Sequence, residues 1–272
     1  KLWEGLGYYS RVRNLQKAAE IICREYQGVF PSEYALIRAL PGIGDYTAGA
    51  IASICFDEKT PAVDGNVLRV MSRLLSDDRC VDDTGVKRDC VRKLAGIYPA
   101  EAGAFTQALM ELGATVCGPN GAPACGSCPM GDLCLARAEG RATALPVRKK
   151  KAPRRQEQMT VYLLTCGDRL AVRRRQERGL LAGLYELPNT LGICSADEAM
   201  EQLSAWNLHP VGDVQSYAAK HIFTHIEWHM RVYCMEVKGA GTAQFIRADG
   251  SQSIPTAFAV CLPAALTENR GV

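Results

Sequence analysis

The chain has 272 residues, of which 47% are hydrophobic and 22% are charged, and its formal net charge is +3. This length is sufficient for two domains that each bury a core, and the composition is typical of a soluble globular protein. No apolar run approaches the roughly 18 residues of a membrane helix, and no signal peptide is visible, so we expect a cytoplasmic protein without membrane contacts. Because residue 1 is Lys and not Met, we expect that the natural N-terminus precedes it.

The twelve cysteines would suit a secreted disulfide scaffold, but eight of them are scattered singly along the chain. The other four lie between residues 117 and 134. This distribution is typical of a cytosolic protein with buried thiols and one metal site. Basic residues also cluster locally, with six between residues 148 and 155 and four between 173 and 178.

Near the N-terminus, the segment Leu2–Leu15 has the sequence LWEGLGYYSRVRNL. Two adjacent tyrosines, glycines on both sides of Leu6 and two arginines predict a loop that grips a ligand. Arg11 is suited to contact a phosphate. Ordinary packing of Tyr8 and Tyr9 against a helix remains the alternative.

From Leu15 to about Leu135 the apolar residues recur with a helical period. We expect the first helix of this region to be stopped by Gly28. A later helix passes through Phe105 and Val116 and leads into the clustered cysteines.

The sequence LPGIGDYTAGAI, residues Leu40–Ile51, predicts a tight turn between two helices. Gly42 and Gly44 allow backbone N–H groups to approach a ligand closely. The second helix is expected to start near Asp45, so its N-terminus points free donors at the same place. Such a turn suits a DNA phosphodiester and carries no base information. A turn with no function beyond the fold is the alternative.

Asp64, in the sequence AVDGNVLRV, directly precedes an apolar-periodic helix. This position is typical of an N-cap, whose side chain accepts hydrogen bonds from the first turn. The pattern alone favours a cap, but a carboxylate held there can also stabilise a cation that develops on a sugar.

The clustered cysteines, Cys117, Cys125, Cys128 and Cys134, have the spacing C-x7-C-x2-C-x5-C. Four thiolates this close predict either a zinc site or a [4Fe–4S] cluster, and the spacing alone does not decide between them. Because the site follows a helix and ends the helical region, we expect a structural role for it.

After the cysteines, residues 141–158 contain two prolines and many charges, which predicts a basic linker that cannot pack a core. From about Thr160 the apolar period changes to two, so strands follow. The segment HIEWHMRVYCMEV should place Ile226, Trp228, Met230 and Val232 on one sheet face, opposite Glu227, His229, Arg231 and Tyr233. We therefore predict an all-α domain over residues 1–140, a linker over 141–158 and an α+β domain over 159–272.

Taken together, the segments LWEGLGYYSRVRNL, LPGIGDYTAGAI, VDGNV and FTQALMELGATVC and the four cysteines resemble the helix-hairpin-helix DNA glycosylases that carry an iron–sulfur cluster. Within that superfamily the chain resembles the adenine DNA glycosylases of the MutY family, which remove adenine mispaired with 8-oxoguanine. The first cysteine gap is x7 where the family usually has x6, a difference that a loop absorbs. The resemblance favours [4Fe–4S] over zinc, and it implies a monomeric, nucleoid-associated bacterial protein that binds duplex DNA with an adenine:8-oxoguanine mispair.

The resemblance also implies roles for individual residues. Endonuclease III, a related glycosylase that also cuts the strand, has a lysine where this chain has Tyr46, so a monofunctional enzyme is expected. Asp64 matches the carboxylate that stabilises the sugar cation, and Tyr46 and Asn66 match residues that orient it and the water. The general-acid glutamate of the family would lie upstream of Leu2. Leu6 and Tyr8 match residues that wedge into DNA while adenine is flipped out.

In the second domain, RRRQERGLLAGLYELPN, residues Arg173–Asn189, resembles the Nudix-like fold at the C-terminus of this family. The acidic box that holds magnesium in working Nudix hydrolases is not present, so nucleotide hydrolysis is not expected. Phe223, Thr224 and His225 match the family's loop at the damaged guanine. Histidines spaced four apart there are expected on a strand or hairpin, which argues against a metal site.

Two other functions remain open from the sequence. One is a lesion-binding protein without catalysis, because the family's general acid is not found in this chain. The other is a thymine-glycol-type relative of endonuclease III, which Tyr46 and the second domain disfavour.

Overall fold

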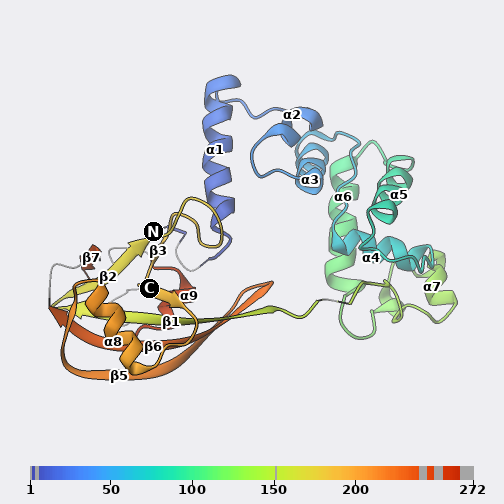
Figure 1. Ribbon diagram of the computed structural model, residues 1–272. Coiled ribbons are helices and arrows are strands. Elements are labelled where there is room, and N and C mark those ends of the chain that lie inside the picture. The colour runs from blue at the N-terminus through green and yellow to red at the C-terminus, as the bar shows by residue number, and fades with distance from the viewer. Residues whose placement is uncertain (1, 4–5, 151, 239–243, 248–253, 264–272) are drawn as a thin grey trace. The chain divides into compact units, whose positions relative to one another are not determined.

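The computed structural model describes residues 2–3, 6–150, 152–238, 244–247 and 254–263 (Figure 1). The chain divides into two compact units, one of residues 10–151 and one of residues 152–272 together with 1–9. The first unit is helical and the second contains a mixed sheet with helices, so the predicted fold class is confirmed. None of the described helices is both long and apolar enough to cross a membrane.

The helical unit contains most of the predicted helices at the expected positions. Its described elements are α1 (Tyr9–Glu25), α2 (Tyr34–Ala39), α3 (Asp45–Phe56), α4 (Gly65–Leu74), α5 (Thr84–Ala95), α6 (Ala102–Glu111), the π-helix η1 (Leu112–Val116), the 3₁₀ turns η2 (Cys125–Ser127) and η3 (Gly131–Leu133), and α7 (Leu135–Ala138).

The N-terminal segment differs from the expected loop, because α1 already begins at Tyr9. Arg11 therefore lies on the first turn of a helix, where its side chain is exposed. The run of residues from Tyr9 to Glu25 contains no glycine or proline, which favours continuation of the helix to this end. Gly28, with φ +81°, closes the helix by donating its N–H to the Ile22 carbonyl, as predicted.

Helix α4 is the centre of the helical unit and contacts α5, α6, α7 and η1. Buried apolar residues before and on α4 pack against those of α5, α6 and the loop between them. These residues are Val63, Val67, Met71, Cys90, Leu94, Tyr98 and Ala102. A smaller core of Ile37, Ala48 and Ala52 joins α2 to α3.

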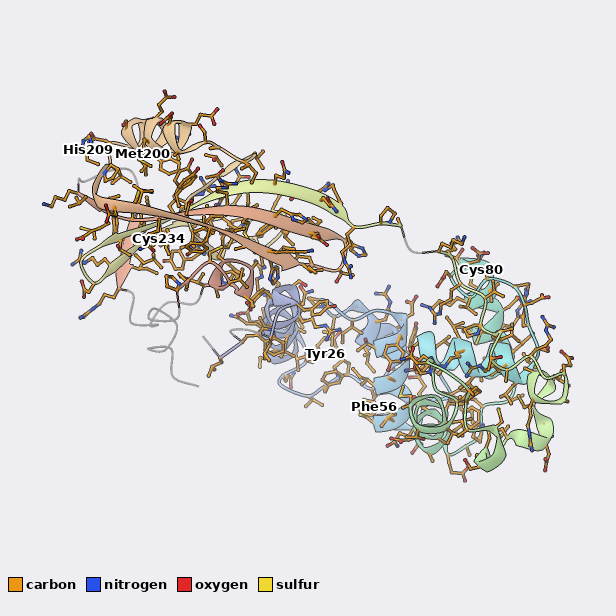
Figure 2. All side chains as sticks on the ribbon, turned by 90° about the horizontal axis from the view of Figure 1, so that it is seen from below. Tyr26, Phe56, Cys80, Met200, His209 and Cys234 are labelled. Carbon is orange, nitrogen blue, oxygen red and sulfur yellow. The ribbon has the colours of Figure 1, made fainter. Side chains whose placement is uncertain are left out.

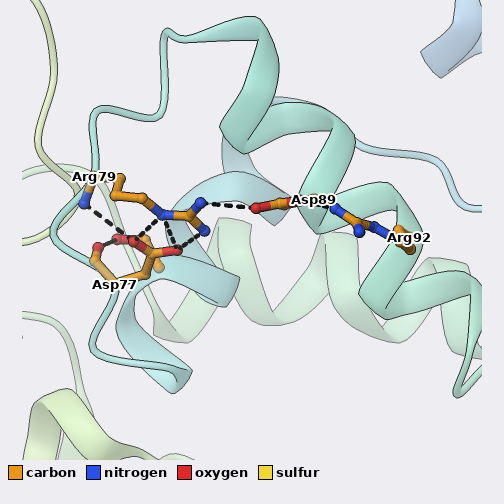
Figure 3. A network of polar contacts seen from close by, with 5 residues as sticks. Asp77, Arg79, Asp89 and Arg92 are labelled. Carbon is orange, nitrogen blue, oxygen red and sulfur yellow. Dashed lines mark hydrogen bonds and ion pairs between the residues drawn. The ribbon is translucent and has the colours of Figure 1, made fainter.

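The loop between α4 and α5 is fixed by a surface network of ion pairs (Figure 3). The Arg79 guanidinium contacts Asp77 at 2.6 Å and Asp89 on α5 at 2.7 Å, and Asp89 also pairs with Arg92. Single exposed ion pairs contribute little to stability, but linked pairs contribute more. Because Arg79 contacts both Asp77 and Asp89, this network orders the loop between α4 and α5. Asp82 and Asp83, further along the same loop, contact Arg148 and Lys149 of the segment that leads to the second unit.

Residues 141–150 pack on the helical unit, so the prediction of an unpacked linker is wrong for this part of the chain. Leu145 is only 2% exposed, and the Val81 N–H donates to the Val147 carbonyl at 3.0 Å. The Lys149 ammonium lies 2.7 Å from Asp83. Burial of Leu145 and pairing of basic side chains with carboxylates therefore allow this charged segment to pack. The other end of the predicted linker also differs, because the first strand begins at Arg155.

The second unit contains a mixed sheet with the strand order β3-β2-β1-β6-β5, to which β4 is added beside β1 and β7 beside β2. Strands β1 and β6 are parallel, and the other pairs are antiparallel. The elements are β1 (Arg155–Cys166), β2 (Arg169–Arg174), β3 (Tyr185–Glu186), β4 (Asn189–Leu191), α8 (Ala196–Ala205), β5 (His209–Ile222), β6 (Ile226–Lys238), β7 (Gln244–Arg247) and α9 (Thr256–Ala259).

Both faces of the central strands are covered, one by α8 and the other by α9. Figure 2 shows α8, which carries Met200, over the sheet that contains Cys234. Trp228, Met230 and Val232 point into one core as predicted. The opposite face of β6 becomes apolar only from Tyr233 onward, where α8 covers it. Its first residues therefore remain polar and partly exposed.

We predict that Leu145→Ala destabilises the helical unit by about 2–4 kcal/mol, because truncating a fully buried leucine leaves a cavity. Denaturant unfolding measures this free energy. The neighbouring Val147→Ala is the matched control, since Val147 is 39% exposed and should lose less than half as much. Equal, small effects of both substitutions would show that residues 141–150 do not pack as described.

Candidate active site

Asp64 is the N-cap residue of α4, as predicted from the sequence. Its Oδ1 accepts hydrogen bonds from the N–H groups of Asn66 and Val67, both at 2.8 Å. Its Oδ2 accepts from Asn66 Nδ2 at 3.0 Å. Both carboxylate oxygens are therefore held by the first turn of the same helix, which fixes the orientation of the group.

Tyr46, on the first turn of α3, lies close enough to Asp64 to be influenced by its charge. Burial, and then the negative charge of Asp64, raise the pKa of the Tyr46 phenol above its ordinary value. The phenol is therefore a neutral hydrogen-bond donor near neutral pH. The structure thus holds Asn66 against Asp64 and places Tyr46 within reach of the Asp64 charge, while the chemical roles of all three residues stay predictions.

Arg69 and Arg73 of α4 are both 3% exposed and connect α4 to the cysteine segment. Arg69 donates to Asn66 Oδ1 at 3.0 Å, to the Gly113 carbonyl at 2.7 Å and to the Cys117 carbonyl at 2.8 Å. Arg73 donates to Cys117 Sγ at 3.2 Å. A continuous set of hydrogen bonds therefore joins Asp64, through Asn66 and Arg69, to the first of the four cysteines.

The close approach of η1 to α4 depends on Gly113. A Cβ atom at this position would lie 2.9 Å from Asn66 Cβ, closer than such atoms approach. η1 is a π-helical continuation of α6, and such segments occur frequently at functional sites. Glycine at this point allows Arg69 to reach the Gly113 carbonyl while Asn66 contacts Asp64.

The four clustered cysteines line a single pocket between α4 and the turns η2 and η3. None of them forms a disulfide, and each is partly exposed. The pocket wall also contains Val70, Leu74 and Leu112, together with the guanidinium-bearing residues Arg73 and Arg137. Thiolates are the metal-binding form of cysteine, and arginines provide a matching positive charge.

The arrangement of these side chains does not match a site for one ion. Among the described residues, no three His, Cys, Asp or Glu side chains are placed to hold a metal ion together. The four cysteines therefore share a pocket without converging on one point. Four cysteines that line one pocket could supply thiolates to a shared group.

The turn between α2 and α3 has the predicted conformation. Gly42 has φ +79°, and a Cβ atom there would lie 2.6 Å from the Asn14 side chain, so only glycine fits. Gly44 caps α3 without a side-chain hydrogen bond. The first N–H groups of α3 are thus not satisfied by a cap.

The side chain of Asp45 contributes to this turn through Arg38. The Arg38 guanidinium lies 2.5 Å from Asp45 and also donates to the Ile43 carbonyl at 2.9 Å. The hydrogen bond from Arg38 lowers the pKa of the Asp45 carboxyl. An ionised carboxylate repels phosphate, so Asp45 can contact DNA through its backbone N–H but not through its side chain.

The remaining predicted DNA contacts lie at the N-terminus and in the second unit. Leu6 and Tyr8 are 65% and 67% exposed, and Tyr8 has φ +45°, which is unusual for a large side chain. Thr224 and His225 are exposed in the turn between β5 and β6, and Phe223 is half-buried there. These positions suit contacts with a ligand, although no contact with DNA follows from exposure alone.

Sequence reasoning missed Arg69 and Arg73. A sequence signal for them was present, because the two arginines are four residues apart within the apolar-periodic segment GNVLRVMSRL. A charged residue repeated at helical spacing inside such a pattern indicates a buried, paired group if the same helix face carries the core.

Comparisons with known proteins support two families. Residues 1–95 match the model of the HhH-GPD superfamily base excision DNA repair proteins, and residues 159–262 match the model of the NUDIX domain. Similar curated proteins are the adenine DNA glycosylases of Arabidopsis thaliana and Rattus norvegicus. The Arabidopsis protein is 35% identical, and the match covers 89% of this chain and 43% of that protein. The rat protein is 33% identical, and the match covers 88% of this chain and 56% of that protein. The chain therefore spans about half the length of the curated relatives it matches.

Among solved structures, a non-covalent endonuclease III–DNA complex is 31% identical to the chain. The match covers 50% of this chain and 61% of the other, with a TM-score of 0.42. A score this low adds nothing to the sequence matches.

We predict that Arg69→Gln lowers the free energy of unfolding of the helical unit by about 2–4 kcal/mol, because it leaves buried carbonyl groups without donors. Arg24→Gln is the control, since that side chain is 71% exposed on α1 and its loss should have no measurable effect. Denaturant unfolding compares the two variants. Equal stability would contradict the role given to the buried guanidinium.

Proposed function

We propose that the chain is an adenine DNA glycosylase of the HhH-GPD superfamily of base excision DNA repair proteins and that it removes adenine mispaired with 8-oxoguanine from duplex DNA. The reaction is hydrolysis of the N-glycosidic bond. The second unit, which matches the NUDIX domain, then serves to bind the strand that carries the lesion.

The observation that carries this proposal is the fixed carboxylate of Asp64. Cleavage of a glycosidic bond passes through a state in which the sugar carries positive charge. A carboxylate whose two oxygens are held by Asn66 and Val67 needs no reorganisation to stabilise this charge. The neighbouring Tyr46 phenol, neutral at physiological pH, would serve as a hydrogen-bond donor to the water.

A monofunctional reaction is consistent with Tyr46. A lyase step requires an amine that forms an imine with the sugar, and a phenol cannot do so. We therefore propose that water, and not an amine of a side chain, attacks the anomeric carbon of the sugar and replaces the adenine. The family resemblance assigns protonation of the leaving adenine to a glutamate, and none of the described residues is given that role here.

The proposed contacts with DNA are divided among several elements. The turn of Gly42 and Gly44 presents N–H groups at the start of α3 to a phosphate. Leu6 and Tyr8 fill the space that the flipped adenine leaves. Residues 223–225 contact the 8-oxoguanine. Arg11 is proposed to bind a phosphate from α1.

We also propose that the cysteine pocket holds a [4Fe–4S] cluster. Support comes from the four cysteines that line it and from the family resemblance. Cys117, Cys125, Cys128 and Cys134 would each supply one thiolate, and the Arg73 guanidinium would stay hydrogen-bonded to Cys117 Sγ. When bound, the cluster would join the segments around it covalently and so stabilise this end of the unit.

The assay for the main proposal is release of adenine from a duplex with adenine opposite 8-oxoguanine, followed by alkali to cut the abasic strand. It uses the protein expressed from its complete coding sequence. We predict that Asp64→Asn lowers the single-turnover rate by about 10²–10³-fold. Stability should change little, because asparagine is also a good N-cap.

Asp78→Asn is the control for this assay, because Asp78 is an exposed carboxylate in the same unit and should not affect the rate. Unchanged adenine release by Asp64→Asn would contradict the role of Asp64. Binding of the duplex by the wild-type protein without any adenine release would favour a lesion-binding protein.

For the cluster, we predict that the purified protein contains iron and acid-labile sulfide and absorbs in the visible range. Cys128→Ser should lose most of the iron, whereas Cys23→Ser should retain it, because Cys23 lies on α1 outside the pocket. Zinc in place of iron, without visible absorbance, would contradict the cluster.

A further inference from the structure

The turn between β5 and β6 is a short connection at the end of a long strand pair. The Phe223 N–H donates to the Ile226 carbonyl at 2.8 Å and closes the turn. Thr224 and His225 are exposed at its tip. A hairpin end with one closing bond is among the least stable parts of a fold. Something outside the hairpin must set the conformation in which these side chains are presented.

The start of β1 holds both sides of this turn through the backbone. Arg154 Nε donates to the Phe223 carbonyl at 3.2 Å, and the Arg155 N–H donates to the His225 carbonyl at 3.0 Å. The two carbonyl groups on either side of Thr224 are thus tied to Arg154, which precedes β1, and to Arg155, its first residue. Thr224 is the residue between the two fixed points.

The ring of Phe223 is held by aromatic contacts. It packs edge-to-face against His221, with ring centroids 4.6 Å apart, and against Trp228, with centroids 4.8 Å apart. Trp228 is 2% exposed and also contacts Phe258 of α9. Edge-to-face pairs of this kind orient a ring as well as bury it. Phe223 therefore anchors the turn in the core.

Glu157 connects the two kinds of anchor. Its Oε2 accepts a hydrogen bond from Trp228 Nε1 at 2.8 Å, and its Oε1 lies 2.6 Å from the Arg155 guanidinium. Glu157 and Trp228 are register partners on the parallel strands β1 and β6. The Glu157 carboxylate thus joins Arg155, whose N–H holds the turn backbone, to the indole of Trp228, which packs against Phe223.

We propose that Glu157 and Trp228 are positioning residues that determine how strongly the protein prefers 8-oxoguanine to guanine. The inference rests on the proposed function, in which residues 223–225 contact the lesion. The two bases differ only at C8 and N7, where 8-oxoguanine has an added oxygen and an N–H donor. A difference of one or two hydrogen bonds is detected only if the protein groups are fixed to about 0.5 Å. The pair of Glu157 and Trp228 supplies that rigidity to Thr224 and His225.

The test compares the affinity of the full-length protein for two duplexes with an uncleavable adenine analogue, one opposite 8-oxoguanine and one opposite guanine. Trp228→Phe keeps an aromatic ring in the core but removes the N–H that binds Glu157. Glu157→Gln keeps an oxygen that can accept from Trp228 but removes the charge that pairs with Arg155. Trp206→Phe is the matched control, because Trp206 is a partly buried tryptophan that packs on Tyr162 at the opposite face of the sheet.

We expect both variants to reduce the ratio of the two affinities about tenfold, a change of about 1.4 kcal/mol in discrimination. Affinity for the guanine duplex should remain near wild type in both variants, which a general loss of structure would not allow, whereas the thermal midpoint of Trp228→Phe should fall because a buried ring becomes smaller. The control should retain the wild-type ratio.

Two outcomes would overturn the inference in different ways. If the wild-type protein prefers 8-oxoguanine and both variants keep that preference, the positioning role is wrong and the proposed function stands. If the wild-type protein has no preference, the proposed function fails and the inference fails with it.

Discussion

The hydrogen bonds of the buried Arg69 guanidinium are the constraint on which the helical unit depends. They join three segments that are far apart in the sequence: the first turn of α4, the π-helix η1 and the start of the cysteine segment. A guanidinium with its donors unpaired inside a protein would cost several kcal/mol, so these segments cannot move independently without that loss. Asp64, held by Asn66 within the same set of bonds, is thereby fixed relative to Cys117. The candidate catalytic carboxylate and the first candidate cluster ligand belong to one rigid assembly.

Arg73, one helical turn further, extends the same arrangement to the end of the unit. Its Nε donates to the Leu145 carbonyl at 2.9 Å and its Nη1 to Cys117 Sγ. The segment after the cysteines is thus held by the helix that begins at Asp64. In the second unit, the Glu157 carboxylate similarly joins two strands, β1 and β6. In each unit one buried or half-buried charged group thus fixes a segment that is proposed to contact the substrate: the first turn of α4 in the helical unit and the turn between β5 and β6 in the second unit.

The sequence predicted the local features of the site better than its long-range contacts. The cap at Asp64, the tight turn at Gly42 and the faces of β6 follow from rules that act over a few residues, and they were correct. Patterns that treat arginine as exposed did not foresee Arg69 and Arg73, most of whose partners lie more than 40 residues away. Composition alone also hid the packing of Leu145, since one apolar residue among many charges has no periodicity.

The central claim is that Asp64 stabilises positive charge on the sugar. Its most direct test is the affinity for a duplex in which the adenosine is replaced by a cationic pyrrolidine, compared with a neutral tetrahydrofuran, both opposite 8-oxoguanine. Because an enzyme binds a mimic of its transition state more tightly than a neutral analogue, we expect the wild-type protein to prefer the cationic duplex at least about 10²-fold. Asp64→Asn should remove that preference. An unchanged preference in the Asp64→Asn variant would contradict the account.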